Sequence, residues 1–188
     1  LRELLRVGLP QGLGDFLDVA TFLVFFAIVG RQGVVALAAS NIGAQVSHLL
    51  FMPGMAVGIA VSSYVGRFLG GLRPDHARHS VYRGMLLAVV YMGSMSLPLF
   101  FLGEPIARLF TDNPAVIAQS GLMFKVMAFY QVFDAIGMVL RGALYGAGDT
   151  LFVSVVLGAM SVGVMLPATW LMALWIDPPL VGAWMGAS

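Results

Sequence analysis

The sequence predicts an all-α, polytopic membrane protein with five full transmembrane helices and the start of a sixth. Sixty per cent of its residues are hydrophobic and only 10% are charged, whereas a soluble domain carries roughly 25% charged residues. Long uncharged stretches recur, each near or above the roughly 20 residues that a helix needs to cross a bilayer. Cysteine is absent, which excludes disulfides and cysteine metal sites. The net charge of +1 gives no indication of a nucleic-acid partner.

The first two spans are predicted at residues 10–30 and 36–66. The first contains Asp15 near its beginning, where the helix dipole favours a carboxylate. Asp18 lies about a turn deeper, where a functional role competes with capping or snorkelling. The second span contains Pro53, followed by two glycines. This combination predicts a bend or a local unwinding, which membranes tolerate where the freed carbonyls find a partner or line a cavity.

Three polar residues of the second span are expected on one helix face. Asn41, Gln45 and His48 follow i, i+4, i+7 spacing. Hydrogen bonding between helices explains such a stripe, and lining of a substrate cavity explains it equally well. His48 has no other histidine or carboxylate near it in the sequence, so it is a weak basis for a metal site.

The later spans are predicted at residues 84–103, 115–144 and 150–176, with the opening of another at the end of the chain. Pro167 predicts a kink in the fifth. The segment 67–83 contains four arginines and two histidines against one aspartate, so we expect a basic loop. Over alternate connections, seven arginines fall on the side of the N-terminus and two on the other. The positive-inside rule therefore predicts that the N-terminus and the 67–83 loop lie in the cytoplasm. The expected location is the cell inner membrane, which the chain would cross several times.

Asp134 is the first functional candidate because it lies in the middle of the fourth span. There it is roughly 15 Å from either surface of a hydrocarbon core about 30 Å thick, and a carboxylate at that depth must face water, a partner or an ion. Tyr130 precedes it by one helical turn and shares its face, and Arg141 falls near the same line. Asp18 and Asp134, on neighbouring helices, cannot both be charged cheaply, so they are expected to bind a proton or a cation.

Several short motifs, in their order and spacing, resemble those of the multidrug and toxic compound extrusion (MATE) transporters. The motifs are Gly8-Leu-Pro10, Ala38-Ala39, Leu50-Phe-Met-Pro53, Ala60-Val-Ser62, Phe110-Thr-Asp112, Tyr130-Gln-Val-Phe-Asp134, Gly146-Ala-Gly-Asp-Thr150 and Gly182-Ala-Trp184. MATE transporters have twelve helices in two six-helix lobes, and the match resembles the C-terminal lobe over nearly the whole chain. The resemblance implies that residues 1–188 form this lobe, with its final helix truncated, and that an N-terminal lobe is its partner.

The resemblance implies a transporter without cofactor or enzymatic activity. Its expected function is an antiport driven by H⁺ or Na⁺, which exports small organic cations, drugs or toxic metabolites by alternating access. Carried over by position, Asp18, Tyr130 and Asp134 resemble the cation-binding group of the family. Asp18 and Asp134 would be metal ligands only if the coupling ion is Na⁺. Several relatives have a glutamate in place of Asp18, and the usual arginine before the glycine-aspartate-threonine turn is Tyr145 here.

The polar stripe of the second span also has a counterpart in the family. Asn41 and Gln45 resemble its cavity-lining positions, and His48 continues their stripe by one turn. We therefore expect these three residues to line the substrate cavity.

Three alternatives remain open. A lipid-linked oligosaccharide flippase of the same superfamily is expected to line its cavity with several arginines, whereas only Lys125 and Arg141 lie within spans here. An intramembrane aspartyl protease shares the pattern Gly146-Ala-Gly-Asp149 but needs a tyrosine-aspartate pair on the preceding helix, which is missing. A structural subunit without transport activity would leave Asp18 and Asp134 without a purpose.

Overall fold

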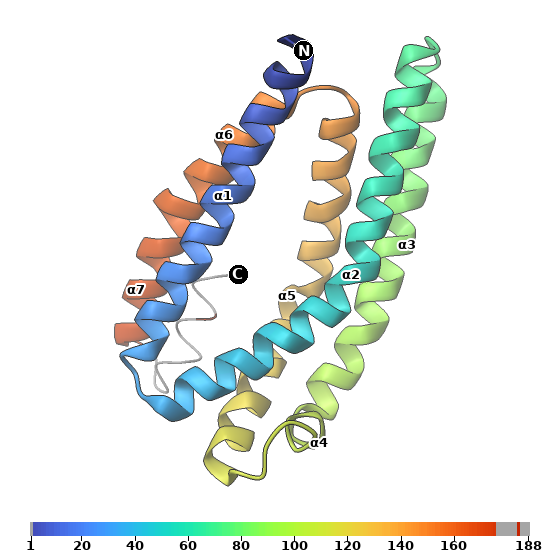
Figure 1. Ribbon diagram of the computed structural model, residues 1–188. Helices are drawn as coiled ribbons and strands as arrows, with labels where there is room; N and C mark the ends of the chain where they lie inside the picture. The colour runs from blue at the N-terminus through green and yellow to red at the C-terminus, as the bar shows by residue number, and fades with distance from the viewer. Residues whose placement is uncertain (1, 176–183, 185–188) are drawn as a thin grey trace.

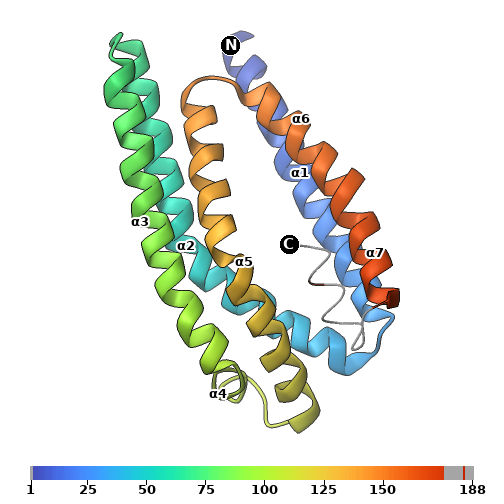
Figure 2. The same ribbon diagram turned by 180° about the vertical axis from the view of Figure 1, so that it is seen from behind.

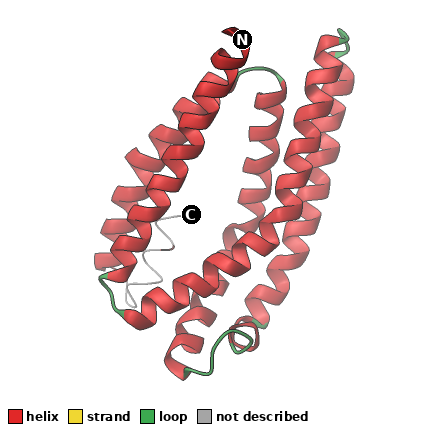
Figure 3. Cartoon of the chain, in the orientation of Figure 1, coloured by secondary structure: helices red, strands yellow, loops and turns green. Residues whose placement is uncertain are grey.

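The computed structural model describes residues 2–175 and Trp184, and at several of these positions, Asp15 and Asp18 among them, it describes the backbone but not the side chain. Within this part of the chain every regular element is a helix and no strand occurs (Figure 3). Five helices of the described part are long and apolar enough to cross a membrane. The predicted all-α membrane architecture is therefore confirmed, and the predicted start of a sixth span lies outside the described residues, Trp184 excepted.

The helices are α1 (Arg2–Gly30), α2 (Val34–Gly70), α3 (Pro74–Phe101), α4 (Gly103–Ala107), α5 (Pro114–Gly146), α6 (Thr150–Met160), the π-helical turn η1 (Ser161–Met165) and α7 (Leu166–Trp175). The C-terminal ends of the first four spans lie within four residues of the predicted ones, whereas α1 and α3 begin eight and ten residues earlier than predicted. The N-terminal end of α1 and the α2–α3 and α5–α6 turns lie at one end of the molecule, and the α1–α2 turn and α4 lie at the other (Figure 1).

The basic segment 67–83 is helical, so its assignment as a loop was wrong. α2 continues to Gly70 and α3 begins at Pro74, a position where proline's missing N–H leaves no helical hydrogen bond unmade. In the short turn between them, Leu72 has a left-handed φ of 55° and the Arg73 N–H donates to the carbonyl of Phe68 at 2.9 Å. The basic side chains consequently stand on two helix ends that extend the membrane spans.

The turn between α5 and α6 is stabilised by a glycine and an aspartate. Gly148 has a φ of 85°, which residues with a Cβ rarely adopt. Oδ1 of Asp149 accepts a hydrogen bond from the N–H of Phe152 at 3.3 Å, so this exposed carboxylate caps the N-terminus of α6. A capping role at a helix end gives no support to the protease alternative, which requires Asp149 as a catalytic acid within the membrane.

The helices form two groups that the chain joins at both ends (Figures 1 and 2). α1 packs along α6, where Gly14 lies against Ser154 and Leu17 against Gly158. α2, α3 and α5 pack closely with one another, and α4 packs on α5. Contacts between the two groups are sparse.

α2 and α5 cross through small residues. A Cβ at Gly142 would overlap the carbonyl oxygen of Gly58, and one at Gly146 would overlap that of Ser62. A Cβ at Gly58 would lie 2.9 Å from the carbonyl oxygen of Met138. The two backbones therefore touch directly, as membrane helices with glycines four residues apart commonly do.

Pro53 lies within a continuous α2, so the alternative of a local unwinding is wrong. α2 is bent along its length, in agreement with the predicted bend (Figure 1). The two glycines that follow Pro53 instead lie in helix contacts. Gly54 is buried against Met92 and Met138, and Gly58 against α5. These glycines serve helix packing because α5 approaches α2 too closely for any larger side chain.

The kink predicted at Pro167 takes the form of a π-helical turn, Ser161–Met165. Proline lacks an N–H, and its ring collides with the carbonyl four residues before it in a regular α-helix. A single π turn relieves such a conflict by widening the helix locally. The fifth span is therefore divided into α6 and α7.

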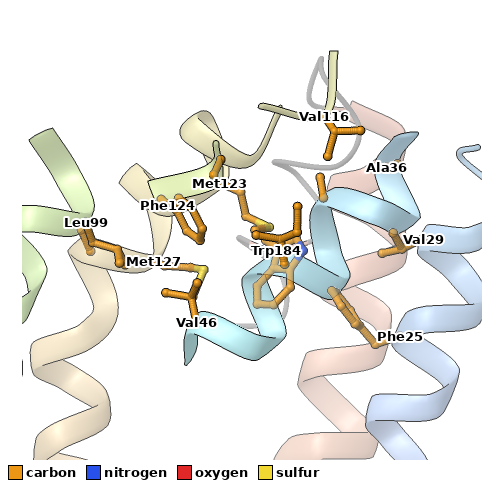
Figure 4. Packing of buried hydrophobic residues seen from close by; sticks show 14 residues of the cluster. Phe25, Val29, Ala36, Val46, Leu99, Val116, Met123, Phe124, Met127 and Trp184 are labelled. Carbon is orange, nitrogen blue, oxygen red and sulfur yellow. The ribbon is translucent and has the colours of Figure 1, made fainter. Parts of the chain in front are cut away.

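The larger hydrophobic core lies where the end of α1 meets the beginnings of α2 and α5 (Figure 4). Phe25 and Val29 of α1 are fully buried in this cluster, which also contains Met123, Phe124 and Met127 of α5. Methionine fills irregular spaces because its side chain is unbranched and polarisable. This core fixes the group of α1 to the group of α2 and α5 at the end opposite the 67–83 hairpin.

Candidate functional site

Tyr130 and Asp134 border one cavity of about 250 Å³. As their spacing predicts, they share a face of α5. The other walls of the cavity come from α1, from α2 and from Trp184: Phe22, Phe25, Ala44, Ser47, His48, Phe51 and Trp184. The cavity thus lies at the sparse junction between the two helix groups.

The carboxylate of Asp134 is incompletely satisfied. Its Oδ2 is buried and has no hydrogen-bond partner in the described part of the chain. Burial of a polar atom without a partner is costly, and a bound proton, cation or polar substrate group would remove that cost. Asp134 also borders a second hollow of about 330 Å³ between α5 and α6, together with Arg141 and Phe152. One carboxylate therefore faces two separate hollows.

The side chain of Asp18 is not described, and only its backbone can be placed, in α1. Among the described residues no three histidine, aspartate or glutamate side chains gather as a metal site would require. The Asp18 side chain is not among them, so the Na⁺ site expected of Asp18 and Asp134 stays a prediction.

The polar stripe of α2 remains together on one face. Asn41, Gln45 and His48 line an open groove of about 500 Å³ that is formed by α2. Asn41 Nδ2 donates to the carbonyl of Leu37 at 3.1 Å, which is a bond within its own helix. His48 borders both this groove and the cavity of Tyr130 and Asp134. The stripe therefore continues into the site.

Trp184 contributes a wall of the cavity that the sequence analysis missed. Its indole N–H donates to Oγ of the fully buried Ser40 at 3.0 Å. Its ring meets the Phe25 ring edge to face, with centroids 5.1 Å apart (Figure 4), an arrangement that aromatic rings prefer. The sequence marked Trp184 only as part of a motif, because no local pattern connects it with residues 144 positions earlier.

Phe22 and Phe25 were also missed, although a signal for them existed. They follow Asp18 by four and seven residues, which is the spacing of one helix face. A candidate acid on a helix thus points to its aromatic neighbours on the same face.

A family model described as MatE matches residues 10–171. The chain belongs to the MatE family. This MatE chain is 31% identical over 185 residues to the probable multidrug resistance protein NorM of Thermotoga maritima, covering 98% of the chain and 40% of that protein. It is 32% identical over 150 residues to the multidrug resistance protein MdtK of Photorhabdus laumondii, covering 80% of the chain and 33% of that protein. The chain therefore spans at most about two fifths of the length of these relatives.

Solved transporters share the fold. A MOP superfamily transporter from Pyrococcus furiosus aligns with a TM-score of 0.90 and 16% identity, covering 98% of this chain and 41% of that one. A multidrug resistance MATE family transporter in an outward-facing conformation aligns with a TM-score of 0.90, the same 16% identity and the same coverage. The MATE resemblance and the membrane fold are therefore confirmed. The curated relatives bear names of multidrug resistance proteins, in line with the prediction that the chain is not an enzyme.

Proposed function

We propose that this chain is the C-terminal lobe of a cation-coupled antiporter that exports organic cations, with Asp134 as the coupling carboxylate. The observation that carries the proposal is the buried Oδ2 of Asp134, which borders the cavity between the helix groups and has no hydrogen-bond partner in the described chain. The names of the NorM and MdtK relatives support multidrug export. The coupling ion is H⁺ or Na⁺.

The position of Asp134 along α5 supports a role within the membrane. It lies 12 residues before Gly146, the end of the helix, which corresponds to about 18 Å of helix. A short aspartate side chain cannot reach the membrane surface over that distance. The charge of Asp134 must therefore be neutralised locally, by a proton, by Na⁺ or by a cationic substrate, and competition among these for one carboxylate is the basis of antiport.

Asp18 and Tyr130 are proposed as partners of Asp134 in binding the ion. The register of α1 puts position 18 on the face that carries Phe22 and Phe25, both of which border the cavity. Tyr130 borders the same cavity and offers a hydroxyl or a ring face to a cation.

The aromatic wall suits a cationic, amphipathic substrate. Phe22, Phe25, Phe51, Tyr130 and Trp184 surround the cavity, and aromatic faces attract organic cations without fixed hydrogen-bond geometry. The polar stripe that His48 joins to the cavity would line the path of the substrate. In this proposal the N-terminal lobe closes the open side of the stripe, as paired repeats do around a central site in transporters.

The oligosaccharide flippase is less well supported. Among the described residues that line the two hollows beside Asp134, Arg141 is the one arginine. A site for an anionic pyrophosphate-linked substrate would be expected to gather several.

The test is ion-driven efflux of a fluorescent cation from proteoliposomes that contain the full-length transporter. Asp134→Asn keeps the side-chain volume but removes the charge, so efflux is expected to be abolished while the protein stays folded and still binds substrate weakly. Asp18→Asn is expected to cause a smaller defect. The double variant should be scarcely worse than Asp134→Asn, because residues that hold one ion are not additive.

The matched control is Asp149→Asn. Asparagine caps a helix as well as aspartate does, so this variant removes a carboxylate outside the site and should transport at the wild-type rate. Efflux by Asp134→Asn at the wild-type rate, with unchanged dependence on pH or sodium, would overturn the proposal.

Orientation is a separate part of the proposal. The N-terminal end of α1 and the α2–α3 turn lie at the same end of the molecule (Figure 1). This agrees with the assignment of alternate connections to the same side of the membrane, from which a cytoplasmic N-terminus was predicted. A cysteine introduced at position 76 should resist an impermeant thiol reagent applied outside intact cells. Labelling of that cysteine from outside would contradict the proposed orientation and favour the opposite one.

A further inference from the structure

A second groove, of about 450 Å³, lies between the end of α2 and the beginning of α3, away from the cavity of Asp134. Its floor is a tight helix contact, because a Cβ at Gly84 would overlap the side chain of Val61. The groove opens on a different face of α2 from the one on which Gly58 and Ser62 meet α5. We propose that this groove binds one anionic phospholipid of the surrounding bilayer, with the phosphate at Arg83 and an acyl chain along Val57 and Leu87.

The upper half of the groove is basic and aromatic. Arg83, His76 and His79 all line it. Phe68 and His76 place their rings 5.4 Å apart, and the Tyr64 ring stacks on Phe68 with an interplanar angle of 18°. Aromatic side chains of this amphipathic kind are enriched at the level of the lipid head groups. This half of the groove thus presents the Arg83 guanidinium beside a set of packed rings to a phosphate.

The segment that contains the groove's basic residues carries a net positive charge. Residues 67–83 contain four arginines and one acid, Asp75. A cationic drug would be repelled here, whereas a lipid phosphate would be attracted. Basic pockets between transmembrane helices are known to hold anionic lipid head groups.

The lower half of the groove is apolar and lies at hydrocarbon depth. Arg83 is the last charge of α3, and residues 84–101 are uncharged; these 18 residues extend about 27 Å, close to the thickness of the hydrocarbon core. Leu87, which is 60% exposed, and Val57 line the groove below this boundary. Val57 meets α3 directly below Arg83, since its Cγ1 lies 3.6 Å from the position of a Cβ at Gly84.

The polar and apolar halves therefore follow the layout of a phospholipid. A free phosphate would contact only the basic half, and a hydrocarbon would contact only the apolar half and leave Arg83 without a ligand. The proposal is independent of the antiport mechanism, since none of the groove residues borders the cavity of Asp134.

The test uses the full-length transporter in phosphatidylcholine vesicles that contain phosphatidylglycerol. Native mass spectrometry after detergent extraction measures how much of each lipid stays bound. Wild-type protein should retain phosphatidylglycerol in preference to phosphatidylcholine. Arg83→Gln should weaken this retention about fivefold, the factor expected when one arginine near an anionic surface is lost, and Arg83→Lys should largely preserve it.

The matched control is Arg78→Gln, since Arg78 belongs to the same basic segment but does not line the groove. Both arginines are exposed, so neither substitution is expected to change folding, which a thermal unfolding midpoint would verify. The proposal fails if Arg78→Gln lowers retention as much as Arg83→Gln, because general surface charge would then be responsible. It also fails if inorganic phosphate displaces the lipid, or if a cysteine at position 64 cross-links to the N-terminal lobe.

Discussion

The crossing of α2 over α5 and the junction between α1 and α5 use two faces of the same helix in opposite ways. At the crossing, Gly142 and Gly146 bring backbone against backbone, and nothing larger than a hydrogen atom fits between the helices. At the junction, Tyr130 and Asp134 face a cavity walled by aromatic side chains. α5 is therefore packed tightly on one side and left open to a ligand on the other.

Substitutions on the two faces of α5 are therefore expected to have different effects, on folding at the crossing and on binding at the junction. A change at the crossing meets main-chain atoms, which cannot move without displacing a whole helix. A change at the junction meets side chains and empty volume, so it alters binding before it alters folding. The variants below test whether folding and function separate in this way.

The largest effect on folding is expected at the crossing, from Gly142→Ala. The added methyl group would overlap the carbonyl oxygen of Gly58, and overpacking of this kind costs about 1–3 kcal/mol or more. The free energy of unfolding in detergent should fall accordingly, measured by chemical or thermal denaturation of the full-length protein.

Gly137→Ala is the matched control on the same helix. A Cβ at Gly137 has no neighbour within 4 Å, and alanine favours a helix over glycine by about 1 kcal/mol. This variant should therefore be as stable as the wild type or more so. Equal destabilisation by the two substitutions would show that the crossing is no tighter than the open face.

A smaller effect is expected at the junction, from Trp184→Phe. Phenylalanine preserves a ring against Phe25 but loses the hydrogen bond to Ser40, a contact worth about 1 kcal/mol. The affinity for substrate should fall by a larger factor than the stability of the fold. Affinity is measured from the fluorescence of a bound organic cation, so that the signal does not depend on the replaced tryptophan. In the double variant with Ser40→Ala the effect should not grow further, and additive losses would contradict the pairing.

The smallest effect on stability is expected from Pro53→Ala. Pro53 is exposed within a continuous α2, and its replacement restores a missing N–H without touching the crossing. Spin-label distances between positions 36 and 66 should lengthen as the bend straightens, and transport should slow while folding is unchanged. A variant that fails to insert would show that the proline is needed for folding instead.

The sequence could predict the five spans and the shared face of Tyr130 and Asp134, because bilayer thickness and the helical period are local constraints. It could not predict the wall formed by Trp184, since that contact joins the last part of the chain to Phe25 and Ser40. The basic segment was misassigned for a related reason. Charge marks where a helix leaves the hydrocarbon, but it does not mark where the helix ends.

The glycines after Pro53 illustrate the same limit. In the sequence a proline followed by glycines indicates a weakened helix. Whether Gly54 and Gly58 weaken α2 or admit a neighbour depends on α5, which begins 56 residues after Gly58. Only the packed structure shows that they admit a neighbour.

The π turn at Ser161–Met165 has a consequence for the phase of the fifth span. One surplus residue rotates everything after it by about 100° relative to a regular α-helix. The face that α6 turns inward therefore cannot be extrapolated to α7, where Thr169 is fully buried and Trp170 is 58% exposed. Deleting one residue from the turn would bring the two segments into phase and carry Trp170 toward a different side of the span. In this span, a helical wheel drawn through the turn would describe a surface that the protein does not have.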